Sequence, residues 1–171
     1  MPYTKEQMIS LLRECKRDPL MNFNVDYWDR KNKDPYEWKV VYQGPKGTPY
    51  EGGIFTVKVN IPSNYPDNDP ENDPDKIIKF FFITRIYHLN IHWKESNNDG
   101  FVCFGNNYEN DIKKLLKLVE TFFSIQNPGS TWYGDKDKQD YLDYMEGKSK
   151  AFYEKAQNWV YLYAGLNQLK Q

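Results

Sequence analysis

The period of the hydrophobic pattern changes twice along this chain, and this change constrains the fold more than any other feature. Near the start, apolar side chains recur three and four residues apart, as on one face of an amphipathic helix: Met8, Leu11, Leu12 and Cys15. A capping box of Thr4 and Gln7 predicts the start of this helix. We expect the helix to end near Asp18-Pro19, because the residue before a proline is disfavoured in helical geometry.

Further along, apolar and polar residues alternate, which is typical of half-buried strands. The alternation covers residues 38–43 and 55–61, and a loop rich in Gly and Pro at 44–53 joins the two segments. The apolar run at 77–82 predicts another strand. Between residues 65 and 75 the chain is acidic and punctuated by prolines, so we expect a loop there.

Helical spacing returns in the second part of the chain. One apolar stripe begins after Asp111 and ends before 127–129; it consists of Ile112, Leu115, Leu116, Val119, Phe122 and Phe123. A last predicted helix has one apolar face, formed by Phe152, Ala156, Trp159, Val160 and Tyr163. This order predicts an α+β fold in a single domain of residues 1–171. We expect an N-terminal helix, an antiparallel β-meander of about four strands and then C-terminal helices.

Charge and composition exclude several classes of function. With 23 basic and 24 acidic residues the net charge is -1, so non-specific binding to nucleic-acid phosphates has no obvious electrostatic driver, and a local basic patch is the alternative. No apolar run approaches the roughly 20 residues that span a bilayer, and residues 1–6 lack a secretory apolar core. Cys15 lies on the predicted buried stripe, which favours unpaired thiols in a reducing compartment. We therefore expect a monomer in the cytoplasm or nucleus, with no nucleic-acid and no membrane partner.

Cys103 is the residue that most strongly suggests chemistry. It lies outside both periodic patterns and follows a turn-rich stretch at 97–100, so we expect the partial exposure that a nucleophilic thiol requires. A buried structural cysteine is the alternative. A cysteine protease would need a histidine base, but His88 and His92 lie close upstream in no protease signature. The chain also lacks the paired spacings of zinc sites, so we expect neither a metal nor a cofactor.

Two polar residues upstream of Cys103 have structural and functional interpretations. For His88 we favour a structural role, because a neutral imidazole in a loop more often holds backbone groups than transfers protons. The carboxamide of Asn90 could donate to a developing oxyanion, where one such donor is typically worth about 10²–10³ in rate. Asn is equally common in turns, where its side chain bonds nearby backbone, so the residue alone favours neither role.

In their order and combination these segments resemble the ubiquitin-conjugating enzyme family. The resemblance covers roughly residues 4–165. The motifs that carry it are Arg17-Asp18-Pro19, Trp38, Gly44-Pro45-Lys46-Gly47-Thr48-Pro49-Tyr50-Glu51-Gly52-Gly53, Tyr65-Pro66, Thr84-Arg85-Ile86-Tyr87-His88-Leu89-Asn90-Ile91, Gly100-Phe101-Val102-Cys103, Asn127-Pro128 and Trp159.

The resemblance implies an acyl carrier. Cys103 would accept ubiquitin or a ubiquitin-like protein as a thioester from the activating enzyme, in a cascade that consumes ATP. It would then pass the modifier to a substrate lysine or to a ligase cysteine, with a ligase of the RING or HECT type as partner. Asn90 would support the oxyanion or fix the active-site loop, and His88 and Tyr87 would support that loop structurally.

The chain departs from the family pattern around the nucleophile. The family's His-Pro-Asn is His88-Leu89-Asn90 here, so the rigid proline is absent. Extra residues around 92–98 separate Asn90 from Cys103. This insertion could displace Asn90 from the thiol. The family's acid that prepares the incoming lysine falls near Ser130, and Asp135 is the nearest downstream carboxylate.

Partner surfaces depart from the pattern as well. The first ligase-contact loop is lengthened into the acidic stretch 67–75, and the second, near 106–110, is shortened. Two hypotheses follow: an active conjugating enzyme, or an inactive variant that serves as a binding module or ligase adaptor. Retention of Cys103 and Asn90 favours the first. A divergent thiol hydrolase is a third, more distant alternative.

Overall fold

The computed structural model describes residues 1–94 and 99–165. It contains an N-terminal helix, α1 (Lys5–Arg17), followed by strands β1 (Asn24–Tyr27), β2 (Glu37–Gln43), β3 (Ile54–Asn60), β4 (Lys79–Phe82), β5 (Ile91–Trp93) and β6 (Gly100–Val102). The helices after the sheet are a short 3-10 turn η1 (Gly105–Asn107), α2 (Ile112–Phe122), α3 (Asp135–Met145), α4 (Ala151–Trp159) and a π-helical extension η2 (Val160–Ala164). The α+β class and the order of helix, sheet and helices are confirmed.

The sequence pattern locates three strands of an expected meander of about four, whereas the sheet has six, in the order β1-β2-β3-β4-β6-β5, with every neighbouring pair antiparallel. The strands that the sequence pattern does not predict are β1, β5 and β6, which have four, three and three residues. Three or four residues are too few for an alternating pattern to stand out from a turn-rich background.

Helix α1 begins and ends as predicted. Thr4 and Gln7 form the capping box, and Asp18, the residue before Pro19, terminates the helix in extended conformation. Met8, Leu12 and Cys15 are buried, and Leu11 packs against the core as a partly buried residue. Burial raises the pKa of the Cys15 thiol to about 11, so this cysteine stays a protonated, inert thiol.

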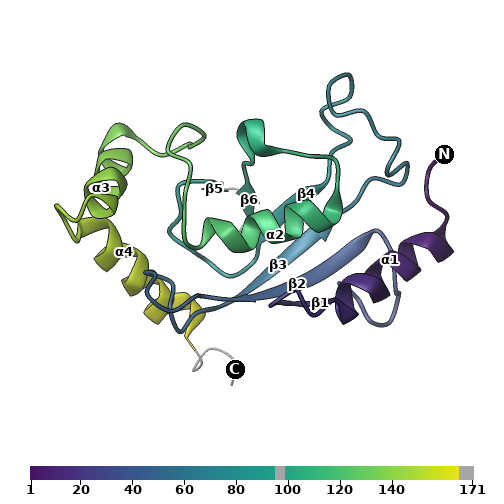
Figure 1. Ribbon diagram of the computed structural model, residues 1–171, viewed down its shortest axis with the longest axis horizontal. Helices are drawn as coiled ribbons and strands as arrows, with labels where there is room; N and C mark the ends of the chain where they lie inside the picture. Colours follow the sequence, from purple (N-terminus) through teal and green to yellow (C-terminus); the bar gives the residue numbers. More distant parts are fainter. Residues whose placement is uncertain (95–98, 166–171) are drawn as a thin grey trace.

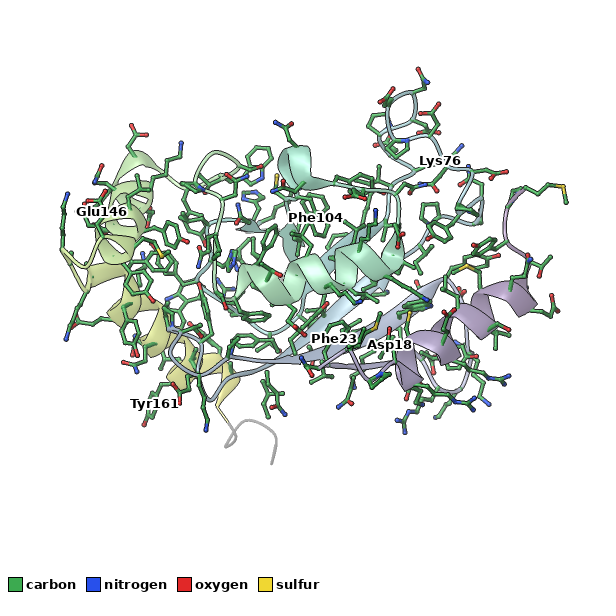
Figure 2. The ribbon with its side chains drawn as sticks, in the orientation of Figure 1. Asp18, Phe23, Lys76, Phe104, Glu146 and Tyr161 are labelled. Atoms are coloured by element: carbon green, nitrogen blue, oxygen red, sulfur yellow. The ribbon has the colours of Figure 1, made fainter. Side chains whose placement is uncertain are left out.

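Helix α2 lies across the sheet, while α1 lies at one end of the molecule and α3 and α4 at the other (Figure 1). The packing between α2 and the sheet is aromatic: the ring of Phe123, at the end of α2, contacts Tyr42, Phe55 and Phe82 of β2, β3 and β4. Figure 2 shows Phe104 in the interior beside α2, and its ring contacts that of Phe122. Burying such rings supplies much of the folding free energy.

The last helix is buried along only part of its predicted face. Phe152, Ala156 and Val160 are buried, whereas Tyr163 is 41% exposed and contacts Trp159 edge to face. Tyr161 points outward from the end of this helix in Figure 2. None of the helices among the described residues is both long and apolar enough to cross a membrane.

Candidate active site

The position of Cys103 is set by β6, the last strand along the chain. It follows β6 directly and is half-buried, and both cysteines of the chain are free thiols. Its backbone N–H donates to the carbonyl oxygen of Asn90 over 2.8 Å, and its Sγ lies 3.3 Å from the hydroxyl Oγ of Ser130. The partial exposure expected from the sequence is therefore confirmed, and the structural alternative of a buried cysteine applies to Cys15 instead.

The side chain of Asn90 is buried and fully occupied by the loop that faces Cys103. Its Nδ2 donates to the carbonyl oxygens of Asn127 at 2.7 Å and Ser130 at 2.9 Å. Its Oδ1 accepts the backbone N–H of Asn127 at 2.9 Å. A carboxamide has two donor hydrogens, and both are used here. In this structure Asn90 therefore fixes the loop 127–130 beside Cys103.

His88 is a buried structural residue. Its Nε2 lies 2.7 Å from the carbonyl oxygen of Phe122, and its Nδ1 accepts the backbone N–H of Asn90 at 3.0 Å. These two contacts assign the hydrogen to Nε2 and leave no ring nitrogen for a substrate. Burial lowers the pKa of His88 to about 4, because the charged imidazolium would be desolvated. The ring is therefore neutral and is no base for Cys103.

Leu89, which stands where the family has a proline, makes a hydrogen bond that a proline could not make. Its side chain is buried, and its backbone N–H donates to Oε1 of Gln126 at 2.8 Å. Proline lacks this donor. The loss of the proline's rigidity is thus accompanied by a new contact between the segment 87–90 and the segment after α2.

Tyr87 connects the active-site segment to the C-terminal helices. Its hydroxyl donates to the Oδ1 of Asp137 in α3, and its ring contacts Phe152 and Trp159 of α4. Burial, together with the hydrogen bond to Asp137, raises the pKa of Tyr87 far above its usual value. The phenol is therefore a permanent donor that holds α3 and α4 against residues 87–90.

Two buried residues near the site, Tyr50 and Gln126, have roles that the sequence did not single out. The Tyr50 hydroxyl donates to the carbonyl oxygen of Tyr87 at 2.6 Å and accepts from Nε2 of Gln126 at 2.6 Å. The backbone N–H of Gln126 donates to the hydroxyl of Tyr141 at 2.7 Å. This network joins the loop 44–53, the segment 87–90 and α3. The sequence signals for these roles are slight: Tyr50 lies within the motif at 44–53, and Gln126 immediately precedes Asn127-Pro128.

The structure does not bring every predicted residue together. Asp135 is the exposed first residue of α3, and no hydrogen bond or ion pair among the described residues connects it with Cys103, Asn90 or Ser130. Of the extra residues at 92–98, those at 95–98 lie outside the described part of the chain. Described residues on both sides of them form an antiparallel hairpin of β5 and β6, in which Ile91 pairs with Val102 and Trp93 with Gly100.

The two loops that the resemblance relates to ligases meet in space. The side chains of Asn68 and Asn110 donate to each other, over 2.7 Å and 2.8 Å. Asn68 also donates to the carbonyl oxygen of Lys76, a residue that Figure 2 labels on the projecting loop. The acidic stretch 67–75 and the segment 106–110 therefore form one surface, which we call the paired-loop surface.

The surroundings of Cys103 limit the chemistry that its thiol can perform. In the described residues, the one side chain hydrogen-bonded to the Cys103 thiol is that of Ser130, and both ring nitrogens of the buried His88 are engaged elsewhere. A half-exposed thiol without a dedicated base suits exchange between thioesters better than hydrolysis of an amide. Within residues 1–94 and 99–165, no group of His, Cys, Asp and Glu side chains could hold a metal ion.

A family model described as "Ubiquitin-conjugating enzyme" matches residues 6–159. The chain belongs to the ubiquitin-conjugating enzyme family. A relative from Dictyostelium discoideum, "Ubiquitin conjugating enzyme E2 B", is 30% identical over 136 residues, which are 75% of this chain and 78% of the relative. The family that the sequence motifs suggested is confirmed.

Two further comparisons show how far the similarity extends. "Probable ubiquitin-conjugating enzyme E2 31" of Arabidopsis thaliana is 44% identical over 68 residues, 40% of this chain, and the matched segment spans 36% of that relative. The solved E2 domain of a Toxoplasma gondii ubiquitin conjugating enzyme superposes with a TM-score of 0.67 at 21% identity. That comparison covers 94% of this chain and 98% of the Toxoplasma chain, and it shows the shared fold.

Proposed function

We propose that this member of the ubiquitin-conjugating family carries ubiquitin or a ubiquitin-like protein as a thioester on Cys103. The observation that carries the proposal is the half-exposed thiol, which lies beside Ser130 on a loop fixed by the buried Asn90. An inactive adaptor would need neither the thiol nor its support. Within residues 1–94 and 99–165, no histidine is hydrogen-bonded to Cys103, as the base of a thiol hydrolase would be.

In the loading step, the Cys103 thiolate attacks the carbonyl carbon of the thioester that the activating enzyme presents. A new C–S bond forms on Cys103, the old C–S bond breaks, and the activating enzyme's cysteine leaves as a thiolate. The proton of Cys103 has passed to solvent beforehand. The two thioesters have nearly equal free energies, so the step depends chiefly on positioning rather than on a strong base.

In the transfer step, the neutral amine of a lysine adds to the carbonyl carbon of the thioester on Cys103. A tetrahedral oxyanion forms, the C–S bond then breaks, and Cys103 leaves as a thiolate while the nitrogen releases a proton to water. A ligase cysteine is the alternative acceptor and needs only a second thioester exchange. Fixed loops around the thiol favour both reactions, because they keep the acceptor's approach constant.

The proposed partners are the activating enzyme, the modifier and a ligase. We assign the ligase contact to the paired-loop surface, whose acidic residues include Asp67, Asp69 and Asp73. The lengthened acidic stretch favours a ligase with a basic complementary segment, of either the RING or the HECT type. Basic residues of α1, among them Arg13, Lys16 and Arg17, are the proposed contact for the activating enzyme.

The proposal is tested by a thioester assay with activating enzyme, ATP and ubiquitin, read on non-reducing gels. The expected result is an adduct that reductant removes and that Cys103→Ala lacks. Ubiquitin-like modifiers with their own activating enzymes are assayed in parallel. No adduct with any of these modifiers would contradict the proposal and support the adaptor.

A further inference from the structure

The oxyanion of the transfer step needs a hydrogen-bond donor, and the expected one is already engaged. Both donor hydrogens of the Asn90 carboxamide go to backbone carbonyls, over 2.7 Å and 2.9 Å. The backbone N–H of Asn127 donates to the Oδ1 of Asn90. A flipped Asn90 carboxamide would therefore place its Nδ2 against the backbone nitrogen of Asn127. Donation from Asn90 to an oxyanion would therefore require one of these buried bonds to break.

The hydroxyl of Ser130 has no such commitment. Among the described residues its Oγ has a single hydrogen-bonding contact, the Cys103 Sγ at 3.3 Å. Asn90 holds the backbone carbonyl of Ser130, so the hydroxyl is presented to the sulfur from a fixed main chain. A hydroxyl can rotate its single hydrogen toward whichever acceptor carries charge.

The space for this hydroxyl depends on a glycine. Gly105 has a φ of +56°, in the left-handed region, and a Cβ at that position would lie 2.4 Å from the Oγ of Ser130. A side chain at position 105 would therefore displace the hydroxyl from the thiol. The close approach of the serine to the main chain of Gly105 is what brings the oxygen within reach of the sulfur.

We propose that Ser130 is a catalytic residue whose hydroxyl donates a hydrogen bond to the carbonyl oxygen of the thioester on Cys103. This inference rests on the proposed function. As the amine's nitrogen bonds to the carbonyl carbon, negative charge accumulates on the carbonyl oxygen. This oxygen is bonded to the same carbon as the Cys103 sulfur. The Ser130 hydrogen bond strengthens as this charge grows and weakens again when the C–S bond breaks. Ser130 keeps its proton throughout, and Asn90 acts as a positioning residue for it.

The role differs from that of the carboxylate which usually prepares the lysine. A serine hydroxyl is neutral and does not take the amine's proton, whereas it is well suited to donate to an oxyanion. Removing one oxyanion donor typically costs about 10²–10³ in rate. Because Ser130 is half-buried rather than fully desolvated, we expect an effect of about 10-fold to 100-fold.

The test separates loading from discharge. The wild-type protein, Ser130→Ala and Ser130→Thr are each charged with ubiquitin, the activating enzyme is quenched, and discharge onto free lysine is followed over a range of lysine concentrations. We expect Ser130→Ala to lower the maximal discharge rate about 10-fold to 100-fold, leaving the lysine concentration at half-maximal rate unchanged. Thermal unfolding and the rate of Cys103 alkylation by iodoacetamide should match the wild type, and Ser130→Thr should retain most of the rate. Ser124→Ala, an exposed serine at the end of α2, is the matched control.

A second variant tests the same contact without touching the serine. Gly105→Ala should slow discharge by displacing the hydroxyl, and it should slow it much less when Ser130 is already alanine. Discharge from Ser130→Ala at the wild-type rate would overturn the inference while leaving the thioester function intact. Equal losses in alkylation and discharge would also overturn it, because they would indicate support of the thiol rather than of the oxyanion. Absence of any thioester on the wild-type protein would overturn both proposals.

Discussion

The backbone N–H of Cys103 donates to the carbonyl oxygen of Asn90 over 2.8 Å, although thirteen positions separate the two residues in the sequence. The antiparallel pairing of β5 with β6 explains this proximity, since Ile91 and Val102, the neighbours of these residues, are directly paired. Extra length between paired strands extends the far end of the hairpin and leaves the near end in register. The main chain of Asn90 therefore lies beside that of Cys103, in spite of the extra residues that could have displaced it.

Replacement of the nucleophile should separate chemistry from folding. Cys103→Ala is expected to abolish thioester formation with little change in the melting temperature, because this side chain is half-exposed. Cys15→Ala is the matched control: it should load normally yet lose about 1 kcal/mol of stability, because the thiol is buried in the core. Non-reducing gels and thermal unfolding of both variants provide the comparison. Normal loading of Cys103→Ala would contradict the assignment of the nucleophile.

Asn90→Ala should spare loading and slow transfer to lysine. It removes two donors from partly buried carbonyls and an acceptor from the N–H of Asn127, so we also expect about 2–4 kcal/mol lower stability. If Asn90 acts by placing Ser130, the same substitution should slow discharge much less in a Ser130→Ala background. Single-turnover discharge and urea unfolding measure the two effects. Transfer at the wild-type rate would leave Asn90 a purely structural residue.

Acid should destabilise the fold through His88. Its pKa is about 4 in the folded protein against an ordinary value of 6.5, so the unfolded chain binds the proton first as the pH falls. Stability from the neutral ring is complete above pH 6.5 and is lost progressively down to about pH 4. The full loss amounts to about 3 kcal/mol. Urea unfolding between pH 4 and 7 checks this against His88→Asn, whose total loss of stability over that pH range should be smaller by about 3 kcal/mol. Equal slopes would exclude His88 as the cause.

The hydrogen bond between Leu89 and Gln126 should be measurable as a coupling. Leu89→Pro restores the family's residue type but removes the N–H donor and leaves the buried Oε1 of Gln126 unpaired. We expect a loss of about 1–3 kcal/mol of stability from the unpaired oxygen. Loss of the packing of the buried leucine adds to it. The double mutant with Gln126→Leu should lose less than the sum of the single mutants in thermal unfolding. Strict additivity would show that the bond contributes nothing.

Tyr87→Phe should loosen the C-terminal helices without affecting the nucleophile directly. The substitution removes the hydroxyl that donates to Asp137 and keeps the ring contacts with α4. A hydrogen bond to a carboxylate is typically worth about 1.5–3 kcal/mol, so the melting temperature should fall while loading persists. Tyr161→Phe, on an 80% exposed side chain, is the control and should leave stability unchanged. An unchanged melting temperature for Tyr87→Phe would remove the proposed anchoring role.

Elements with a strong hydrophobic periodicity could be predicted from the sequence, and elements with a weak one could not. The apolar stripes of α1 and α2 and the alternation in β2 and β3 follow from burial of one face, which leaves a clear record in the sequence. By contrast, α3 has one buried residue, Tyr141, and it follows the loop without a side-chain cap. Its position is set by contacts with Tyr87 and Gln126. These come from distant parts of the chain and are invisible to local pattern.

The candidate site divides in the same way. Cys103 and Asn90 stand out because of their residue types and the motifs around them, and the structure brings them together. Ser130 was identified only through its place after Asn127-Pro128, and its contact with the thiol depends on the carbonyl held by Asn90. Asp135 is only the nearest downstream carboxylate in the sequence, and no hydrogen bond or ion pair among the described residues connects it with Cys103, Asn90 or Ser130. Sequence proximity cannot predict which side chain of a loop turns inward.

The reciprocal amides of Asn68 and Asn110 join two loops that are more than 40 positions apart in the chain, with each side chain donating to the other. The loss of conformational entropy that accompanies the ordering of these loops therefore occurs during folding and does not reduce the free energy of binding a partner. A ligase that contacts both loops would meet a rigid epitope. Its affinity would then depend on complementarity of shape and charge instead of on induced ordering.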